Sequence, residues 1–348
     1  MANIIIKNIY YMLSYAFQAL HSTGFDNVAS EDFDNIHDLF AAILSHGVGV
    51  QVKRGLHRDY VRNEETLAGL RGQINVAETI KHQTQSHGKL VCSYDDFSPD
   101  SPYNQILKSV MLLLLRHGNV KTENKKALHK ALLYFSEVTE VTPAEIRWDS
   151  LKFHRNNSSY RMLMGICRLV VKGLLLTTEK GTYKLSTWLQ GEEMYQLYEK
   201  FVLSYYLAHH PEFSPKVAFI NWDITDGEKS SYLPLMKSDI YMQCGEKIMI
   251  IDTKYYQHTM QKNSLYDSRK YISGNLYQIY TYVKNADKGV TGNVAGVLLY
   301  AKTDETVTPD EDMIIGGNRI SLKTIDLNCD WDVITGQLER LCEWLDCA

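Results

Sequence analysis

Two carboxylates and a lysine stand at spacings that would bring them together on one β-hairpin. Asp239 lies six residues before Gly245-Glu246, Asp252 lies six residues after that pair, and Lys254 follows two positions further on. If Gly245-Glu246 is a two-residue turn, with glycine at the position that requires positive φ, Asp239 faces Asp252 across the strands. Opposed residues have Cβ atoms ~5 Å apart, and Lys254 points to the same face as Asp252. Adjacent carboxylates repel unless a cation lies between them, so the pattern predicts a site for a hard divalent metal ion.

The same residues also fit a second interpretation, a surface cluster of ion pairs on a hairpin. An acid-x-Lys triplet is common by chance, and Glu123-Asn124-Lys125 is another one in this chain. That triplet lies in a polar stretch without a strand pattern, whereas Asp252 ends an apolar run of β-forming residues at 248–251. The segments that follow the hairpin are therefore needed to choose between the two interpretations.

The elements that would position these side chains follow from apolar spacing in the last third of the chain. Helical intervals predict helices over 192–207 and 331–345 and a helix-like segment over 275–283. Apolar β-forming runs predict strands over 295–300 and 320–327. With the hairpin, the predicted order is α-β-β-α-β-β-α.

Two polar residues of the middle helix share one of its faces. Gln278 and Tyr282 are four residues apart, which places them one above the other on a helix. The plainer interpretation is that Tyr282 belongs to the core and Gln278 to the solvated surface.

This order and these residues resemble the PD-(D/E)xK nuclease superfamily. Asp239 stands at its first acid and Asp252-Thr253-Lys254 at its acid-x-Lys triplet. Gln278-x-x-x-Tyr282 is similar to the helix motif of the RecB-like branch, and Glu199 matches an acid often found on the first helix of that fold. Ser238, not proline, precedes the first acid, a departure that the superfamily tolerates.

The resemblance extends over nearly the whole chain to the McrC family, the nuclease subunits of McrBC modification-dependent restriction systems. Three further segments carry it: Asn8-Ile-Tyr-Tyr-Met-Leu-Ser-Tyr-Ala16, Arg54-Gly-Leu-His-Arg-Asp-Tyr60 and Gly69-Leu-Arg-Gly-Gln-Ile74. It implies an AAA+ GTPase ring of the McrB type as partner, which binds the GTP and recognises double-stranded DNA carrying modified cytosine. It implies that this chain stimulates GTP hydrolysis and cuts the DNA.

The resemblance also implies roles for the site residues. Asp239 and Asp252 would hold Mg²⁺ together with the Thr253 carbonyl oxygen and water, since Mg²⁺ needs only one or two carboxylates. Lys254 would orient the attacking water and balance charge on the phosphate. Glu199, Gln278 and Tyr282 would position the lysine, the metal-bound waters or the DNA backbone.

The first half of the chain shows no catalytic constellation. Its spacing predicts strands over 45–60 and 66–80, and helices over 103–117, 124–135 and 160–176. We expect an α+β partner-binding domain over residues 1–185 and an α/β nuclease domain over 186–348, with a restriction-endonuclease-like mixed sheet flanked by helices. The chain has no GxxxxGK[ST] loop, so we expect the partner and not this chain to bind GTP.

Bulk properties fit an ordinary cytoplasmic globular protein. Apolar residues make up 45% and charged residues 22% of the chain, and the formal net charge is −4. The longest apolar run, at 110–115, is too short to cross a membrane. Six scattered cysteines form no CxxC pair, which predicts reduced thiols and no zinc site.

Two other functions remain open at this stage. The chain could be a RecB-like repair nuclease that acts alone, or a non-cutting adaptor that activates a motor ring. The complete set of Asp239, Asp252 and Lys254 speaks against the adaptor. The full-length resemblance speaks against the lone nuclease.

Overall fold

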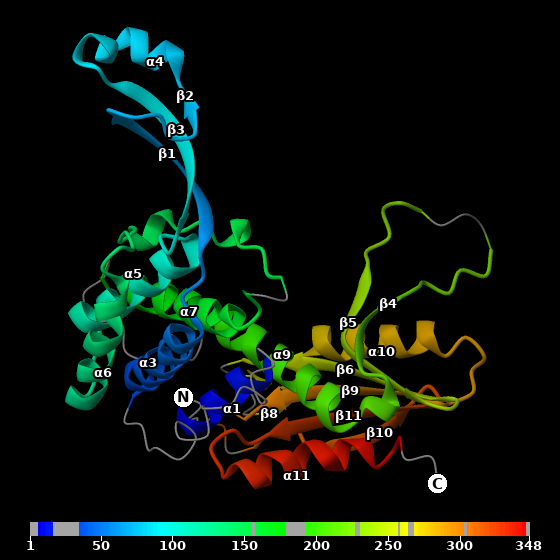
Figure 1. The fold of residues 1–348 in the computed structure, drawn as a ribbon. Coiled ribbons are helices and arrows are strands. Elements are labelled where there is room, and N and C mark those ends of the chain that lie inside the picture. The colour runs from blue at the N-terminus through cyan, green and yellow to red at the C-terminus, as the bar shows by residue number, and fades with distance from the viewer. Residues whose placement is uncertain are drawn as a thin grey trace. The chain divides into compact units, whose positions relative to one another are not determined.

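The chain divides into two compact units in a computed structural model (Figure 1). The arm unit comprises residues 23–180, and the sheet unit comprises residues 1–22 with 181–348. The structure describes residues 6–16, 35–154, 157–178, 192–226, 230–256, 258–263, 268–302, 305 and 307–345. None of the helices among these residues is long and apolar enough to span a membrane.

Four helices form the core of the arm unit. α3 (Ile36–Arg54) packs against α5 (Pro102–His117), α6 (Thr122–Leu132) and α7 (Tyr160–Thr178). Three short 3₁₀ turns follow α6, at Leu133–Phe135, Pro143–Glu145 and Trp148–Ser150. The helices predicted over 103–117, 124–135 and 160–176 are confirmed.

The strand predicted over 45–60 is wrong, because α3 continues through Arg54. The valine-glycine alternation of this segment imitates a strand. A Cβ atom at Gly47 would lie 2.4 Å from Leu163 Cδ2 of α7, so glycine here permits close helix packing. Tertiary packing has therefore overridden local propensity.

A three-stranded sheet extends from the helices of this unit as an arm, residues 57–98 (Figure 1). β1 (Asp59–Leu67) pairs antiparallel with β3 (Leu90–Ser98), and β2 (Gln73–Ile74) pairs with the other edge of β3. α4 (Val76–Lys81) and a 3₁₀ turn (Thr84–His87) lie at the far end. The strand predicted over 66–80 is mostly wrong: the Asn75 side chain accepts from Glu78 N–H and starts a helix instead.

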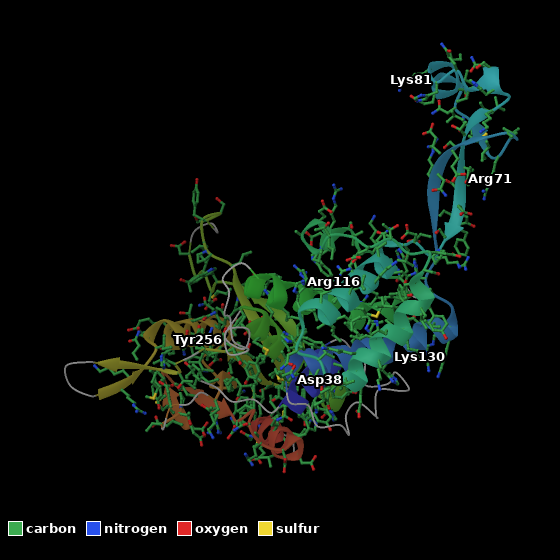
Figure 2. All side chains as sticks on the ribbon, turned by 90° about the vertical axis from the view of Figure 1, so that its left-hand side faces the viewer. Asp38, Arg71, Lys81, Arg116, Lys130 and Tyr256 are labelled. Atoms are coloured by element: carbon green, nitrogen blue, oxygen red, sulfur yellow. The ribbon has the colours of Figure 1, made fainter. Side chains whose placement is uncertain are left out.

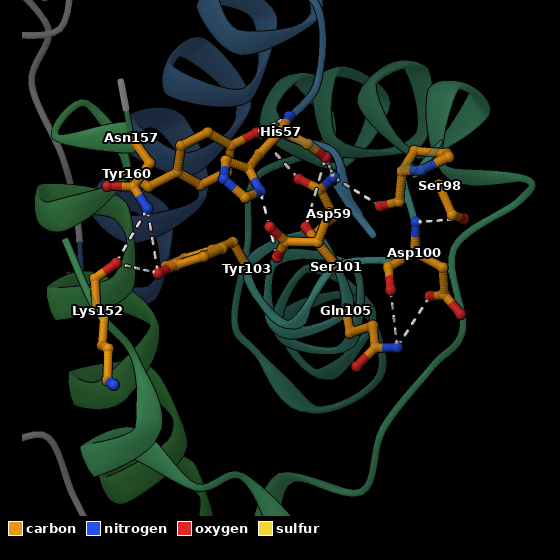
Figure 3. Close-up of polar contacts among 12 residues, drawn as sticks. His57, Asp59, Ser98, Asp100, Ser101, Tyr103, Gln105, Lys152, Asn157 and Tyr160 are labelled. Atoms are coloured by element: carbon orange, nitrogen blue, oxygen red, sulfur yellow. Dashed lines mark hydrogen bonds and ion pairs between the residues drawn. The ribbon is translucent and has the colours of Figure 1, made fainter. Parts of the chain in front are cut away.

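One buried asparagine fastens both strands of the arm at their base. Asn104 Nδ2 donates to the carbonyls of His57, before β1, and Pro99, after β3, at 2.8 Å each. The Tyr160 hydroxyl donates to Asn104 Oδ1 and accepts from the His57 N–H, so the same residues contact α5 and α7 (Figure 3).

Six strands form the mixed sheet of the sheet unit, in the order β10-β11-β9-β6-β5-β4. β6 and β11 flank β9 in parallel, and the other pairs are antiparallel. This confirms the predicted fold class. The strands are β4 (Lys216–Ile220), β5 (Met236–Cys244), β6 (Lys247–Lys254), β9 (Val294–Ala301), β10 (Glu311–Ile315) and β11 (Asn318–Ile325).

Helices cover both faces of this sheet. α10 (Ser273–Ala286) lies on one face of the sheet, and α11 (Trp331–Cys342) lies on the other (Figure 1). The hydroxyl of Tyr206, on α9 (Glu192–His209), donates a hydrogen bond to Leu338 O of α11. A 3₁₀ turn (Pro211–Phe213) follows α9, and a separate ribbon of β7 (Met260–Asn263) and β8 (Ser268–Tyr271) precedes α10. The predicted order is therefore incomplete, because β4, β7, β8 and β10 are too short for a pattern to reveal.

Glycine brings α10 close to the sheet. A Cβ atom at Gly296 of β9 would lie 2.7 Å from both Ile279 and Val283 of α10. Those two residues pack with Ile250 and Leu298 in the core of this face. Glycine at this position therefore allows α10 to pack closely against the sheet.

The first helix, α1 (Ile6–Ala16), completes the sheet unit. Asn8 Nδ2 donates to the carbonyls of Leu327 and Cys329 at 3.0 and 2.8 Å, and Tyr11 stacks on Trp331. The division predicted at residue 185 had assigned this helix to the other domain. The prediction failed because the apolar pattern of a helix does not show which part of the fold the helix packs against.

The cysteines depart in part from expectation. Cys92, Cys167, Cys329 and Cys342 form no disulfide bond, as predicted. Cys244, at the end of β5, is disulfide-bonded, so the prediction of reduced thiols is wrong at this position. Spacing along the chain does not show which cysteines the fold brings together.

Asp287 holds the turn between α10 and β9. Its carboxylate accepts hydrogen bonds from the Thr291 N–H and hydroxyl, the Gly292 N–H and Asn318 Nδ2, at 2.7–2.9 Å. Burial alone would raise the pKa of Asp287, but these donors outweigh it and lower the pKa to about 2.

We expect Asp287→Ala to lower the free energy of unfolding by about 3 kcal/mol at pH 7, because it leaves several donors without their acceptor. The folded pKa lies below the ordinary 3.8, so the stabilisation is present above pH ~4 and is lost as the pH falls toward 2. Urea unfolding at pH 7 and pH 3 measures this. Asp310→Ala, in an exposed ion pair with Lys323, serves as control and should cost under about 1 kcal/mol. An equal loss for Asp287→Ala at both pH values would contradict the assignment.

Candidate active site

The predicted hairpin is present in the predicted register. Cys244 pairs with Lys247 and Ile240 pairs with Ile251, around a turn in which Gly245 has φ 56°. Asp239 therefore stands opposite Asp252, one step beyond the last paired residues. The twofold alternation of a strand puts Asp252 and Lys254 on the same face as Ile250, the face that α10 covers.

Asp252 and Lys254 form a buried ion pair. The residues are 2% and 5% exposed, and Lys254 Nζ lies 2.5 Å from Asp252 Oδ2. The interpretation as a surface cluster of ion pairs is therefore wrong. Taking two charges out of water costs several kcal/mol each, which mutual attraction and further hydrogen bonds must offset.

Asp239 is held by the backbone of the neighbouring strand. Its Oδ2 accepts hydrogen bonds from the Thr253 N–H at 2.7 Å and from the Thr253 hydroxyl at 2.8 Å. Thr253 itself is fully buried. The contact fixes Asp239 beside the backbone segment whose carbonyl was predicted to bind metal, a role that stays a prediction.

Ser238 has its own reason to precede the first acid. Its hydroxyl accepts from Ala218 N–H and donates to Ala218 O, both at 3.2 Å. The pairing of β4 with β5 shifts register between Lys216 and Ala218. Proline at 238 has no hydroxyl to make this contact beside the irregularity.

Gln278 and Tyr282 extend the ion pair into α10. Lys254 Nζ donates to Gln278 Oε1 at 3.1 Å, and Gln278 Nε2 donates to the Tyr282 hydroxyl at 3.0 Å. Tyr282 does belong to the core, as the plainer interpretation held. Gln278 contacts the lysine, so that interpretation fails for the glutamine.

α9 brings Glu199 and Tyr195 to the same place. Burial raises the pKa of Glu199, and the charge of Asp239 raises it further. Burial also raises the pKa of Tyr195, as do the charges of Asp239, Asp252 and Glu199. Sequence reasoning missed Tyr195, although its spacing of four from Glu199 puts the two on one helix face.

The charge state of the ion pair follows from burial and from its partners. Burial raises the pKa of Asp252 to about 6; Lys254 opposes this rise, and Asp239 adds to it. Burial lowers the pKa of Lys254, but Asp252 outweighs that effect and raises it overall. Lys254 is therefore an ammonium at neutral pH, and Asp252 changes its protonation near pH 6.

The site fits a cation bound by few protein ligands. Asp252 Oδ2 is buried, and its partner among the described residues is the Lys254 ammonium, 2.5 Å away. No group of three or more His, Cys, Asp or Glu side chains arranged for a metal is found among the described residues. Two carboxylates, with water completing the shell, suit Mg²⁺.

Comparison with known proteins identifies the family to which the chain belongs. The chain belongs to the family described as "McrBC 5-methylcytosine restriction system component", whose sequence profile matches residues 6–301. The family predicted from the sequence is thereby confirmed.

Two relatives are similar over most of the chain. One is the "Type IV methyl-directed restriction enzyme EcoKMcrBC" of Escherichia coli (strain K12), 29% identical over 339 residues, covering 96% of this chain and 95% of the relative. The other is a chain in an assembly of Thermococcus gammatolerans McrB AAA+ hexamers with bound McrC. It matches with a TM-score of 0.53 at 17% identity, covering 97% of this chain and 75% of its own, which shows a common fold.

We expect binding of Mg²⁺ to weaken about tenfold between pH 7.5 and pH 5.0, because a ligand must be deprotonated and the pKa of Asp252 is about 6. Above pH 6 the carboxylate is free to bind the ion; one pH unit below, about nine in ten are protonated. Calorimetric titration with MgCl₂ measures this. Asp252→Asn is the control and should bind weakly at both pH values. Equal affinity of the wild type at both would argue against Asp252 as a ligand.

Proposed function

We propose that this chain is the endonuclease subunit of a GTP-dependent, modification-dependent restriction system, and that it hydrolyses DNA phosphodiester bonds with Mg²⁺. The observation that carries the proposal is the buried contact series Asp252–Lys254–Gln278 beside Asp239, in a chain of the McrBC family. A buried ammonium next to two carboxylates provides the two kinds of charge that phosphodiester hydrolysis requires. The acids hold a cation, and the lysine faces negative charge.

Each residue has a distinct part in this chemistry. Asp239 and Asp252 would hold Mg²⁺ with the Thr253 carbonyl oxygen; when bound, the ion lowers the pKa of a water and polarises the phosphate. Lys254 orients that water and stabilises the charge that develops on phosphate oxygens. Gln278, held by Tyr282, fixes the lysine head group.

α9 supports the same site. Glu199 is half-buried and close enough to both acids for their charges to raise its pKa, so it can accept a hydrogen bond from a cation-bound water. Glu199 would thus position water without itself binding the cation.

The partner would be an AAA+ GTPase ring of the McrB type. The Thermococcus assembly contains McrB AAA+ hexamers with bound McrC, and the E. coli relative is methyl-directed. The ring would bind the GTP and select double-stranded DNA with modified cytosine in the cytoplasm. Because the ring can supply most phosphate contacts, a nuclease subunit of net charge −4 is no obstacle.

The arm of residues 57–98 is the surface we assign to that partner. Arg71 and Lys81 lie along it in Figure 2, and opposed charges such as Arg71 with Asp96 line it. Tyr60 and Phe97 face each other across β1 and β3, with ring centroids 5.1 Å apart, yet they are 75% and 52% exposed. Exposed aromatic pairs of this kind are typical of protein interfaces.

Cleavage of plasmid DNA tests the proposed chemistry. We expect wild-type chain to linearise 5-methylcytosine-containing plasmid only with Mg²⁺, GTP and the partner GTPase, because selection and delivery belong to the ring. Asp252→Asn and Lys254→Ala should cut at least about 100-fold more slowly while still stimulating GTP hydrolysis. Glu123→Ala, in the chance triplet Glu123-Asn124-Lys125, is the matched control and should cut normally.

The other outcomes identify the alternatives. Cutting by the chain without partner or GTP would make it a nuclease that acts alone. Stimulated GTP hydrolysis without any cutting by the wild type would make it an adaptor. Undiminished cutting by Asp252→Asn would remove the proposed site.

A second variant tests the arm. We expect Tyr60→Ala with Phe97→Ala to weaken binding to the partner at least about tenfold, since truncating central aromatic residues costs 1–2 kcal/mol or more. Partner titration followed by GTP hydrolysis measures this. Leu133→Ala, exposed on the same unit but outside the arm, is the control. Unchanged stimulation by the double variant would assign the contact elsewhere.

A further inference from the structure

A second hydrogen-bonded group lies beside Lys254, outside the residues assigned so far. Asn275 is on α10, three residues before Gln278, and its Nδ2 donates to the Tyr300 hydroxyl of β9 at 3.2 Å. The Tyr256 hydroxyl donates to Asn275 Oδ1 at 3.4 Å. Tyr256 follows Lys254 by two residues and is labelled in Figure 2.

The three residues of this group differ in their exposure to solvent. Tyr300 is fully buried and Asn275 is 6% exposed, whereas Tyr256 is 39% exposed. Asn275 lies one helical turn before Gln278, which accepts a hydrogen bond from Lys254 Nζ at 3.1 Å, so the group lies beside the lysine. Tyr256 is thus a residue of the site that a molecule arriving from solvent can reach.

The bond from Tyr256 is of a kind that is readily exchanged. An O–H···O hydrogen bond is usually 2.7–2.8 Å long, and interactions weaken as they lengthen, so the 3.4 Å contact is weak. A charged phosphate oxygen is a better acceptor than a neutral amide. Tyrosine hydroxyls are also among the side-chain groups that bind DNA phosphates.

We propose that Tyr256 is a substrate-contacting residue, whose hydroxyl donates to a non-bridging oxygen of the DNA phosphates at the cleavage site. Asn275 is its positioning residue: anchored by Tyr300, it holds the phenol beside Lys254 until DNA accepts the bond. This inference rests on the proposed nuclease function, which it deepens by adding a phosphate contact on the accessible side of the lysine.

Single-turnover cleavage of methylated plasmid by the complete complex tests the contact. Tyr256→Phe keeps the ring and removes the hydroxyl; we expect half-maximal cleavage to need about tenfold more DNA, as for loss of one hydrogen bond to a charged group. The maximal rate should fall less. Tyr277→Phe, on α10 and 68% exposed, is the matched control and should resemble the wild type.

A double-mutant cycle tests the positioning role. Asn275→Ala should weaken DNA use in the same direction as Tyr256→Phe, and the double variant should be no worse than Tyr256→Phe alone. A merely structural asparagine would give additive losses and a lower Tm in both backgrounds. Either of those results would overturn the positioning role.

Binding separates this inference from the proposed function. Fluorescence anisotropy of a labelled methylated duplex, with Ca²⁺ replacing Mg²⁺, reports the contact without cleavage. If the wild type does not cut but Tyr256→Phe still weakens binding, the nuclease proposal fails and the contact stands. If Tyr256→Phe binds and cuts as the wild type does, the inference is overturned. If the wild type neither binds nor cuts, both the proposed function and the Tyr256 contact are contradicted.

Discussion

A buried ion pair at the end of a central strand is the constraint on which the site depends. Asp252 and Lys254 can leave water only if each finds a partner, and the period of two in a β-strand gives them one another. The lysine still has donors to satisfy, and Gln278 accepts one of them. Glycine at 296 favours that contact, because a Cβ atom there would crowd Ile279 and Val283 of α10.

The two acids are held in different ways, which gives them different chemistry. Asp239 is partly exposed and is fixed by hydrogen bonds from Thr253. Asp252 is enclosed, and burial brings its pKa to about 6. A proton or a cation can therefore relieve the charge of Asp252 near neutral pH, while Lys254 keeps its own. In the proposed mechanism, a proton and the metal ion would compete for Asp252.

Sequence patterns predicted the residues at the centre of the candidate site but not those around it. The hairpin register follows from a single turn glycine, and helical spacing of four paired Gln278 with Tyr282; both are local rules. Tyr195 and Asn275 escaped because each enters the site from a helix whose rotation about its axis is set by packing. The role of Ser238 was not apparent because its partner, Ala218, lies in β4, a strand too short to predict.

The same limit explains the errors in the first half. The valines of residues 45–54 alternate with small or polar residues, as in a strand, yet Gly47 serves contact with α7. Asn75 begins a helix by capping, which the apolar pattern around it does not reveal. Periodicity reports what a segment could bury, whereas the neighbour that buries it decides the conformation.

The placement of α1 has a consequence for how the protein is made. Asn8 binds carbonyls of Leu327 and Cys329, 319 and 321 positions along the chain. α1 leaves the ribosome more than 300 residues before Leu327 and Cys329, so it must wait for that length of chain before those partners exist. The arm unit, whose residues lie between, can complete its own core in the meantime. The sheet unit is therefore the last part to close, and a ribosome that stops early releases a chain with the arm unit but without a complete sheet unit.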